Sequence, residues 1–265
     1  MKQEILQPVR HYNLHQDPLN NIETIHLVMW NNGLCIAGFD ADQNLLVAKV
    51  YNSTNWNVQV VEAIFVNEPL VAGPQHVTHI WLAEPRQLIV PQHLYEPEAA
   101  RQWLKELHFV EAGESILDAT VFANLNASLV FSVQNKWIDM FYKFFAEAKI
   151  SALSKTLLCQ LVEEKENTID IVVLDHTALI SVYLQGKLLS HQVIDNVDVQ
   201  NLVYKIASIC KDNGIKQNEL SATLSGLCVV DNMKEELRAY FPAMIVDDTD
   251  ENSSLTFLRK MIACA

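Results

Sequence analysis

The sequence has 265 residues, of which half are apolar, and it carries a formal net charge of −13. This length suits one large domain or two of ordinary size, and the apolar fraction is enough for a substantial core. Such an acidic surface repels phosphate backbones and anionic lipid, which argues against nucleic acid or a membrane surface as the partner.

Cysteine usage and hydropathy indicate a cytoplasmic protein. The five cysteines are an odd number and none forms a C-x-x-C pair, which is typical of a reducing compartment. The N-terminal stretch MKQEILQPVRHYNLHQD is too polar for a signal peptide. No window approaches about 18 consecutive apolar residues, so we expect no membrane span.

The chain opens with a lead-in over residues 1–22 that we expect to be loosely structured, followed by three short apolar runs. Their alternation and the turn residues between them predict an antiparallel meander. The Asn-Gly pair in the first turn is typical of a type I′ hairpin. The predicted strands are Thr24–Trp30, Leu34–Phe39 and Leu45–Tyr51, and the predicted turns are Asn31-Asn32-Gly33 and Asp42–Asn44.

The next stretch mixes helices and strands. The clearest helix starts at Pro97, because apolar residues recur at helical spacing after it and proline favours the first helical position. Glu84-Pro85 separates two strands, since proline interrupts regular structure. The predicted elements are a short helix over 57–69, two strands over 76–91, a helix over 96–109 and a strand pair over 115–135.

Two helices are predicted in the middle of the chain, over Lys136–Glu147 and Leu153–Glu164, with a break around Ile150. The first carries an aromatic stripe at helical spacing, which indicates a face packed into the core rather than a groove for a partner. Its members are Trp137, Phe141, Phe144 and Phe145.

The stretch VVLDHTALISVYLQGKLLSHQVID, residues 172–195, continues a run of three strands joined by tight turns at His176-Thr177 and Gln185-Gly186. Helices and strands then alternate, which favours parallel β-α-β crossovers. The predicted elements are helix Val197–Asp212, strand Leu220–Leu224, helix Asp231–Ala239, strand Met244–Val246 and helix Leu255–Ala263.

The order of elements repeats. A three-strand meander, a helix and then alternating strand and helix occur twice, starting near Thr24 and near Thr168. This is a pattern of α/β ribonuclease-H-like domains, and two such domains in tandem make an actin-like architecture with a cleft between the domains. We expect a first domain over 23–152, and a crossing helix with a second domain over 153–265.

Several motifs between residues 135 and 226 carry a family resemblance. A helix, a short strand and a crossing helix lie in IDMFYKFFAEAKISALSKTLLCQLV, the next strand ends at Asp175, and an x-G-K turn follows at Gln185-Gly186-Lys187. This arrangement resembles the actin-like ATPase superfamily, with its nearest likeness to the actin-like proteins of bacterial type IV pilus assembly. The chain is also similar to an uncharacterised bacterial family with this duplicated fold.

The resemblance implies ATP with magnesium as the cofactor and places three loops around it. The first phosphate loop corresponds to Asn31-Asn32-Gly33, the second to Asp175-His176-Thr177, and the adenosine loop to TLSGL with Gly226 as its only glycine. Glycine lets backbone N–H groups approach phosphate closely. Here Trp30 precedes the first turn, no aspartate lies in its strand, and the second turn has no glycine.

These departures argue against ATP hydrolysis. We expect an actin-like-fold protein that has lost catalysis and binds a protein partner, whose cleft keeps at most a structural or regulatory small ligand. A protein of this kind needs an exposed apolar patch. The alternative is a divergent ATP-binding ATPase or small-molecule kinase with replaced glycines.

More ordinary roles remain for the same residues. Asn31-Asn32-Gly33 also fits a plain hairpin turn, and Asp175 also fits a residue capping a turn. Nuclease activity is not expected, because the first strand lacks the carboxylates that hold two metal ions. We predict no metal site, and the acidic run Asp247–Asn252 is expected to be a solvated loop.

Overall fold

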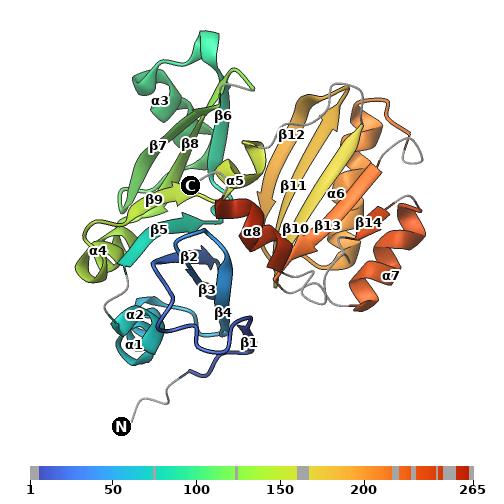
Figure 1. The fold of residues 1–265 in the computed structure, drawn as a ribbon. Helices are drawn as coiled ribbons and strands as arrows, with labels where there is room; N and C mark the ends of the chain where they lie inside the picture. The colour runs from blue at the N-terminus through green and yellow to red at the C-terminus, as the bar shows by residue number, and fades with distance from the viewer. Residues whose placement is uncertain are drawn as a thin grey trace. The chain divides into compact units, whose positions relative to one another are not determined.

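The computed structural model of the chain describes residues 6–73, 76–122, 125–159, 167–216, 221–227, 231–242, 244–246 and 255–262. The chain divides into two compact units, the first formed mainly by residues 1–121 and 126–155 and the second mainly by residues 156–264. Each unit holds its own mixed β-sheet (Figure 1). No helix in the described part of the chain is long and apolar enough to cross a membrane.

The first sheet has the strand order β1-β4-β3-β2-β5-β9. Strands β2, β3 and β4 form the predicted antiparallel meander, and β5 and β9 extend it in parallel. The central strands are buried on both faces, which explains their nearly continuous apolar sequence. The strands are β1 (Arg10–Asn13), β2 (Thr24–Trp30), β3 (Gly33–Phe39), β4 (Leu45–Asn52), β5 (His76–Leu82) and β9 (Lys149–Ala152).

Strand β1 corrects one prediction. The stretch before residue 22 was expected to be loosely structured, but Arg10–Asn13 pairs antiparallel with β4 along its whole length. Its burial alternates between half-buried and exposed. Because β1 lies at the edge of the sheet and its side chains are mostly polar, its sequence lacks the apolar signal of the other strands.

Helices α1 (Val58–Asn67), α2 (Pro69–Ala72) and α4 (Asn135–Phe144) also belong to the first unit. The side chain of Asn57 caps α1 by accepting a hydrogen bond from the amide of Val60, so the predicted short helix is confirmed. The aromatic stripe of α4 packs on α1 through Phe65, whose ring lies 4.9 Å from that of Phe145 and 5.5 Å from that of Phe144. The core role predicted for the stripe is confirmed for Phe141, which is fully buried, while Trp137, Phe144 and Phe145 are half-buried.

The first unit also contains a separate three-stranded sheet with the order β6-β8-β7. The predicted helix packs on it by placing Ala100 and Leu104 against Val90 and Val130. The sequence predicted these strands but not that they form a sheet of their own. The elements are β6 (Gln87–Pro91), a 3₁₀ turn η1 (Gln92–Leu94), α3 (Pro97–His108), β7 (Glu114–Phe122) and β8 (Ala127–Gln134).

The connection between the units differs from the prediction. Ile150, which periodicity places in a break and the family resemblance places in a short strand, lies in strand β9, and the helix expected over Leu153–Glu164 is described only as α5 (Ser154–Leu158). Residues 160–164 of that predicted helix lie outside the described residues. Parallel pairing of β9 with β5 draws Ile150 into the sheet, which periodicity over four residues does not reveal.

The second sheet has the order β12-β11-β10-β13-β14. Strands β10, β11 and β12 form the second predicted meander, and β13 and β14 join it in parallel. The first sheet without β1 has the equivalent order β4-β3-β2-β5-β9, in which a meander is followed by two parallel strands. The predicted repeat is therefore confirmed. The strands are β10 (Thr168–Leu174), β11 (Thr177–Leu184), β12 (Lys187–Ile194), β13 (Ser221–Gly226) and β14 (Met244–Val246).

The core of the second unit lies between one face of this sheet and its helices α6 (Val199–Asp212) and α7 (Asp231–Tyr240). Asp198 caps α6 by accepting a hydrogen bond from the amide of Asn201 at 2.7 Å. A last helix, α8 (Thr256–Ile262), contacts β13. The helices predicted in this half of the chain are therefore confirmed, with ends that shift by one or two residues.

Candidate functional site

The first predicted loop joins β2 to β3. Trp30 pairs with Gly33, so Asn31 and Asn32 alone form the turn. Asn31 is exposed, whereas the indole of Trp30 is only 2% exposed. A Cβ atom placed on Gly33 would lie 2.3 Å from Cζ2 of Trp30. The indole therefore lies directly over Gly33 and occupies the space that this glycine leaves open.

This geometry corrects the predicted turn type. A type I′ turn needs positive φ at both central residues, but Asn31 and Asn32 are not among the described residues with positive φ. Gly33 is the first residue of β3 and also lacks positive φ. The glycine is required because the Trp30 ring needs room on the neighbouring strand, and not because the turn needs a left-handed residue.

The second predicted loop joins β10 to β11. Leu174 pairs with Thr177, so Asp175 and His176 form the turn. Asp175 has φ +57°, a left-handed conformation that glycine adopts most easily. The imidazole of His176 is 68% exposed, and its backbone carbonyl accepts a hydrogen bond from Val197 just before α6. The backbone thus takes a glycine-like shape here without a glycine.

Thr177 is buried beside this turn. Its hydroxyl donates a hydrogen bond to Asp195 Oδ1 at 2.8 Å, at the far end of the meander. Burial raises the pKa of Asp195, and the Thr177 hydrogen bond acts in the opposite direction. The pair joins β11 to the end of β12, so Thr177 has a structural partner. The sequence did not indicate Asp195, because nothing in the pattern shows which acid faces the threonine.

Gly226 ends β13 next to β10. Its φ is +134°, and a Cβ atom there would lie 2.0 Å from the carbonyl oxygen of Val173. The amide of Leu227 then donates to that same carbonyl at 3.0 Å. Because β10 and β13 are parallel neighbours, Gly226 lies at the same end of the sheet as Asp175, His176 and Thr177. Four predicted site residues therefore gather at one edge of the second sheet.

A cluster of aromatic rings in the first sheet was not predicted. Trp81 donates from Nε1 to Nδ1 of the buried His26 at 3.2 Å and stacks on His79, with ring centroids 5.4 Å apart. Burial, with a smaller contribution from His79, lowers the pKa of His26 to about 3. His26 is therefore neutral at ordinary pH, with its proton on Nε2 because Nδ1 accepts. It is a hydrogen-bond acceptor rather than a base.

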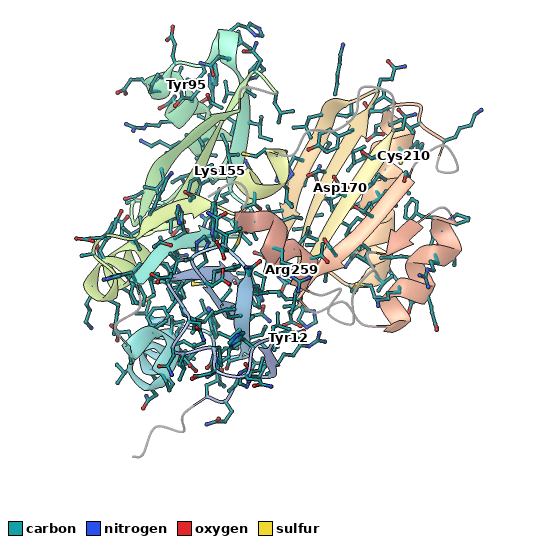
Figure 2. The ribbon with its side chains drawn as sticks, viewed as in Figure 1. Tyr12, Tyr95, Lys155, Asp170, Cys210 and Arg259 are labelled. Carbon is teal, nitrogen blue, oxygen red and sulfur yellow. The ribbon has the colours of Figure 1, made fainter. Side chains whose placement is uncertain are left out.

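Lys155 lies at the edge of this cluster and is labelled in Figure 2. It is buried, and its Nζ lies 5.8 Å from the centre of the Trp81 ring. Burial lowers the pKa of His79 first, and Lys149 and Lys155 lower it further. The cluster depends on the parallel pairing of β2 with β5, including a bulge between Ile25 and His26. Sequence spacing alone does not reveal that register.

The second sheet has a corresponding polar face. Asp170, labelled in Figure 2, accepts a hydrogen bond from Thr223 at 2.5 Å, and Ser181 contacts Nδ1 of His191 at 2.8 Å. Burial raises the pKa of Tyr183, with a smaller contribution from Asp170. Burial alone lowers the pKa of His191 to about 4. Asp170 is the third residue of its strand, as His26 is of β2, so both repeats place a polar group at this position.

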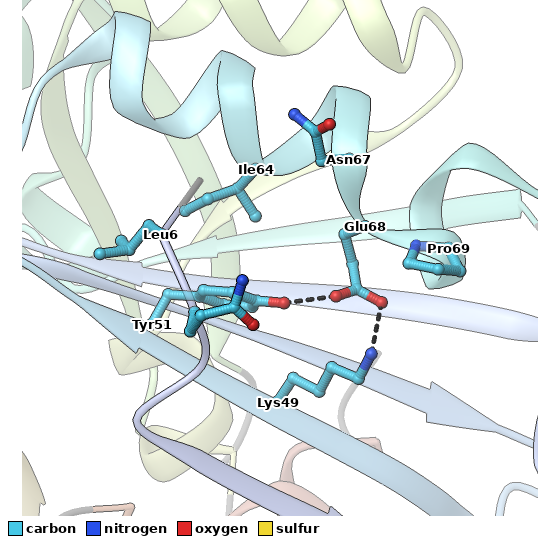
Figure 3. Close-up of a pocket in the computed structure, with 8 residues that line it drawn as sticks. Leu6, Lys49, Tyr51, Ile64, Asn67, Glu68 and Pro69 are labelled. Carbon is cyan, nitrogen blue, oxygen red and sulfur yellow. Dashed lines mark hydrogen bonds and ion pairs between the residues drawn. The ribbon is translucent and has the colours of Figure 1, made fainter. Parts of the chain in front are cut away.

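A pocket of about 200 Å³ lies beside β4 (Figure 3). At its centre the Glu68 carboxylate accepts hydrogen bonds from Lys49 at 2.7 Å, from the Tyr51 hydroxyl, and from the amide of Leu70 at 3.1 Å. Burial, followed by Glu68, raises the pKa of Tyr51. Both carboxylate oxygens are engaged, so the arrangement caps α2 and fixes it to β4 rather than presenting a reactive group.

No group of three or more metal-ligating side chains occurs within the described ranges. The acidic run Asp247–Asn252 lies entirely outside the described residues. His79, which forms an H-x-x-H pattern with His76, faces aromatic rings instead of further ligands. His79 is therefore part of the aromatic cluster in the first sheet and not of a metal site within the described ranges.

Solved structures are similar to this chain over most of its length. One is a protein of Bacteroides thetaiotaomicron VPI-5482 described as having an actin-like ATPase fold and unknown function. It matches with a TM-score of 0.76 and 15% identity over 92% of this chain and 98% of its own. Another is the PilM-PilN type IV pilus biogenesis complex, with a TM-score of 0.52 and 11% identity over 92% of this chain and 98% of the matched chain.

These likenesses show the fold and not the activity, because the identities are low. No curated protein gives a significant match. A family model described as "Protein of unknown function (DUF3822)" matches residues 24–244, which extend from the first strand of the first repeat to the last strand of the second. The chain has an actin-like ATPase fold and belongs to the DUF3822 family.

Proposed function

We propose that this chain is a cytoplasmic actin-like-fold protein that no longer hydrolyses ATP and acts by binding a protein partner. The observation that carries the proposal is the indole of Trp30, which is buried over Gly33 at the position of the first phosphate loop. A phosphate needs open space beside backbone N–H groups, and an indole ring fills such space. In this proposal the two ribonuclease-H-like domains are residues 23–152 and 153–265.

Two further observations support partner binding. The PilM relative is known as a complex with PilN, so a protein of this fold works as part of a protein assembly. The described residues also include exposed apolar side chains on α3, which a binding protein requires.

One observation favours the alternative, a divergent ATP-binding ATPase or small-molecule kinase. Asp175 keeps the left-handed backbone that glycine supplies in an active phosphate loop, and Gly226 keeps its own left-handed φ. In that case ATP with magnesium would be held by the residues of the three predicted loops, which are Asn31, Asn32, Gly33, Asp175, His176, Thr177 and Gly226.

Calorimetric titration with ATP and ADP, each with magnesium, separates the two. We expect no heat of binding and no shift in melting temperature at millimolar nucleotide, while an active actin-like ATPase run in parallel gives both. A nucleotide present at about 100 times its Kd stabilises a protein by about 2.7 kcal/mol. A stabilisation of that size would overturn the proposal and make ATP hydrolysis the next assay.

A further inference from the structure

Three apolar side chains at the C-terminal part of α3 are exposed. Trp103 is 38% exposed, Leu107 62% and Phe109 85%. Trp103 and Leu107 are four residues apart and so lie on one face of the helix. Ala100 and Leu104, which pack on the three-stranded sheet, lie on the same apolar side of the helix. The apolar side of α3 thus extends beyond its contact with the sheet, and the described chain leaves this extension exposed.

Phe109 makes this face unusual. It ends α3 with φ +50° and ψ +50°, in the left-handed region that glycine occupies at most helix ends. A phenylalanine there is conformationally unfavourable, and its ring gains little from packing because it is almost fully exposed. Folding therefore does not explain the choice of an aromatic residue at this position, whereas contact with a partner does.

The charges near this surface are mostly acidic. Helix α3 and its flanks carry four acids, Glu96, Glu98, Glu106 and Glu111, and two bases, the exposed Lys105 and the half-buried Arg101. The whole chain carries −13, so two copies would repel each other and anionic lipid would be repelled as well. A partner with apolar anchors and a basic rim is complementary to both features.

We propose that Trp103, Leu107 and Phe109 form the docking surface for a basic amphipathic helix of another protein. An apolar helix face would cover the three side chains, and flanking lysines or arginines would meet the acidic rim. This inference rests on the proposed function, since it names the class of partner for a binding protein.

The test uses two synthetic amphipathic helices of roughly five turns with the same leucine face, one carrying lysine and the other glutamate on the polar face. We expect the lysine peptide to bind the whole 265-residue chain and its affinity to fall as salt is raised. The glutamate peptide should not bind. Trp103→Gln combined with Leu107→Gln should weaken binding about thirtyfold, since both are anchors. Tyr204→Gln, at a 70% exposed aromatic on α6, is the matched control.

The variant Phe109→Gly separates binding from folding. We expect it to raise the melting temperature, because glycine suits the left-handed φ, and to weaken peptide binding at the same time. Absence of lysine-peptide binding, equal binding of the glutamate peptide, or unchanged binding by the variants would overturn the inference. So would a doubled mass in light scattering that the double variant abolishes, because the face would then bind a second copy. The nucleotide titration is independent of all these outcomes.

Discussion

At Gly226 the end of β13 passes against the backbone of Val173 on β10. The carbonyl of Val173 accepts the hydrogen bond from Leu227 that closes this end of the sheet. Any side chain at residue 226 would have to displace backbone rather than a flexible side chain. The glycine predicted as part of an adenosine loop is therefore required by strand packing alone, with or without a ligand.

Replacing Gly226 with alanine should destabilise the protein by at least about 3 kcal/mol, because strained φ and a backbone clash add together. Chemical denaturation monitored by circular dichroism measures this. Gly113→Ala is the matched control, since nothing lies within 4 Å of a Cβ there, and it should change stability by less than about 0.5 kcal/mol. Similar stabilities for the two variants would contradict the packing seen at Gly226.

At the scale of elements, the Phe65 ring of α1 packs against the aromatic rings at α4. Phe65 is 2% exposed and contacts the rings of Phe141, Phe144 and Phe145. Edge-on contacts of this kind add to the free energy of burying the rings. The second link between α1 and α4 is the exposed Lys143–Glu62 ion pair, which contributes little by comparison.

We expect Phe65→Ala to reduce the free energy of unfolding by about 3–5 kcal/mol, because it leaves a cavity among three phenylalanine rings. Val66→Ala, at the next residue and 65% exposed, should lie within about 0.5 kcal/mol of the wild type. Urea titration of both variants gives the comparison. A loss below about 1 kcal/mol for Phe65→Ala would mean that α4 does not depend on α1.

The sequence predicts an element well when the residues of that element alone determine it, and poorly when pairing with a distant strand determines it. The strands β2 and β14 were predicted to the residue, because each is an apolar run bounded by polar residues or proline. Strand β1 was missed because its four residues are polar and its pairing partner lies far along the chain. The contacts of His26 and Trp81 could not be predicted, since they depend on the register of parallel strands that two strands and two helices separate in sequence.

At the scale of the whole molecule, His26 and His191, whose pKa values are both lowered, link stability to pH. The ordinary histidine pKa is 6.5, while those of His26 and His191 are lowered to about 3 and about 4. Between pH 6.5 and 4 the unfolded chain takes up protons at both residues and the folded chain does not. Stability therefore falls as the pH is lowered through this window, by about 1.4 kcal/mol per pH unit for each histidine.

His26→Gln should remove the proton that the unfolded chain takes up at residue 26. We expect the slope of unfolding free energy against pH to decrease by about 1.4 kcal/mol per unit between pH 6 and 4, measured by urea denaturation at a series of pH values. Val28→Ala, in the same strand and equally buried, should lower stability by the same amount at every pH. An unchanged slope in the His26 variant would show that His26 is protonated in the folded chain.

The contact of Trp30 with Gly33 has an evolutionary consequence. A larger residue at 33 would push the indole out, and a small residue at 30 would leave a void over the glycine. The two positions can therefore change only together, so homologous chains should carry either an aromatic residue facing glycine or neither of them. A lineage that reopened this loop for phosphate would have to lose the tryptophan first, and it would pass through a less stable ancestor.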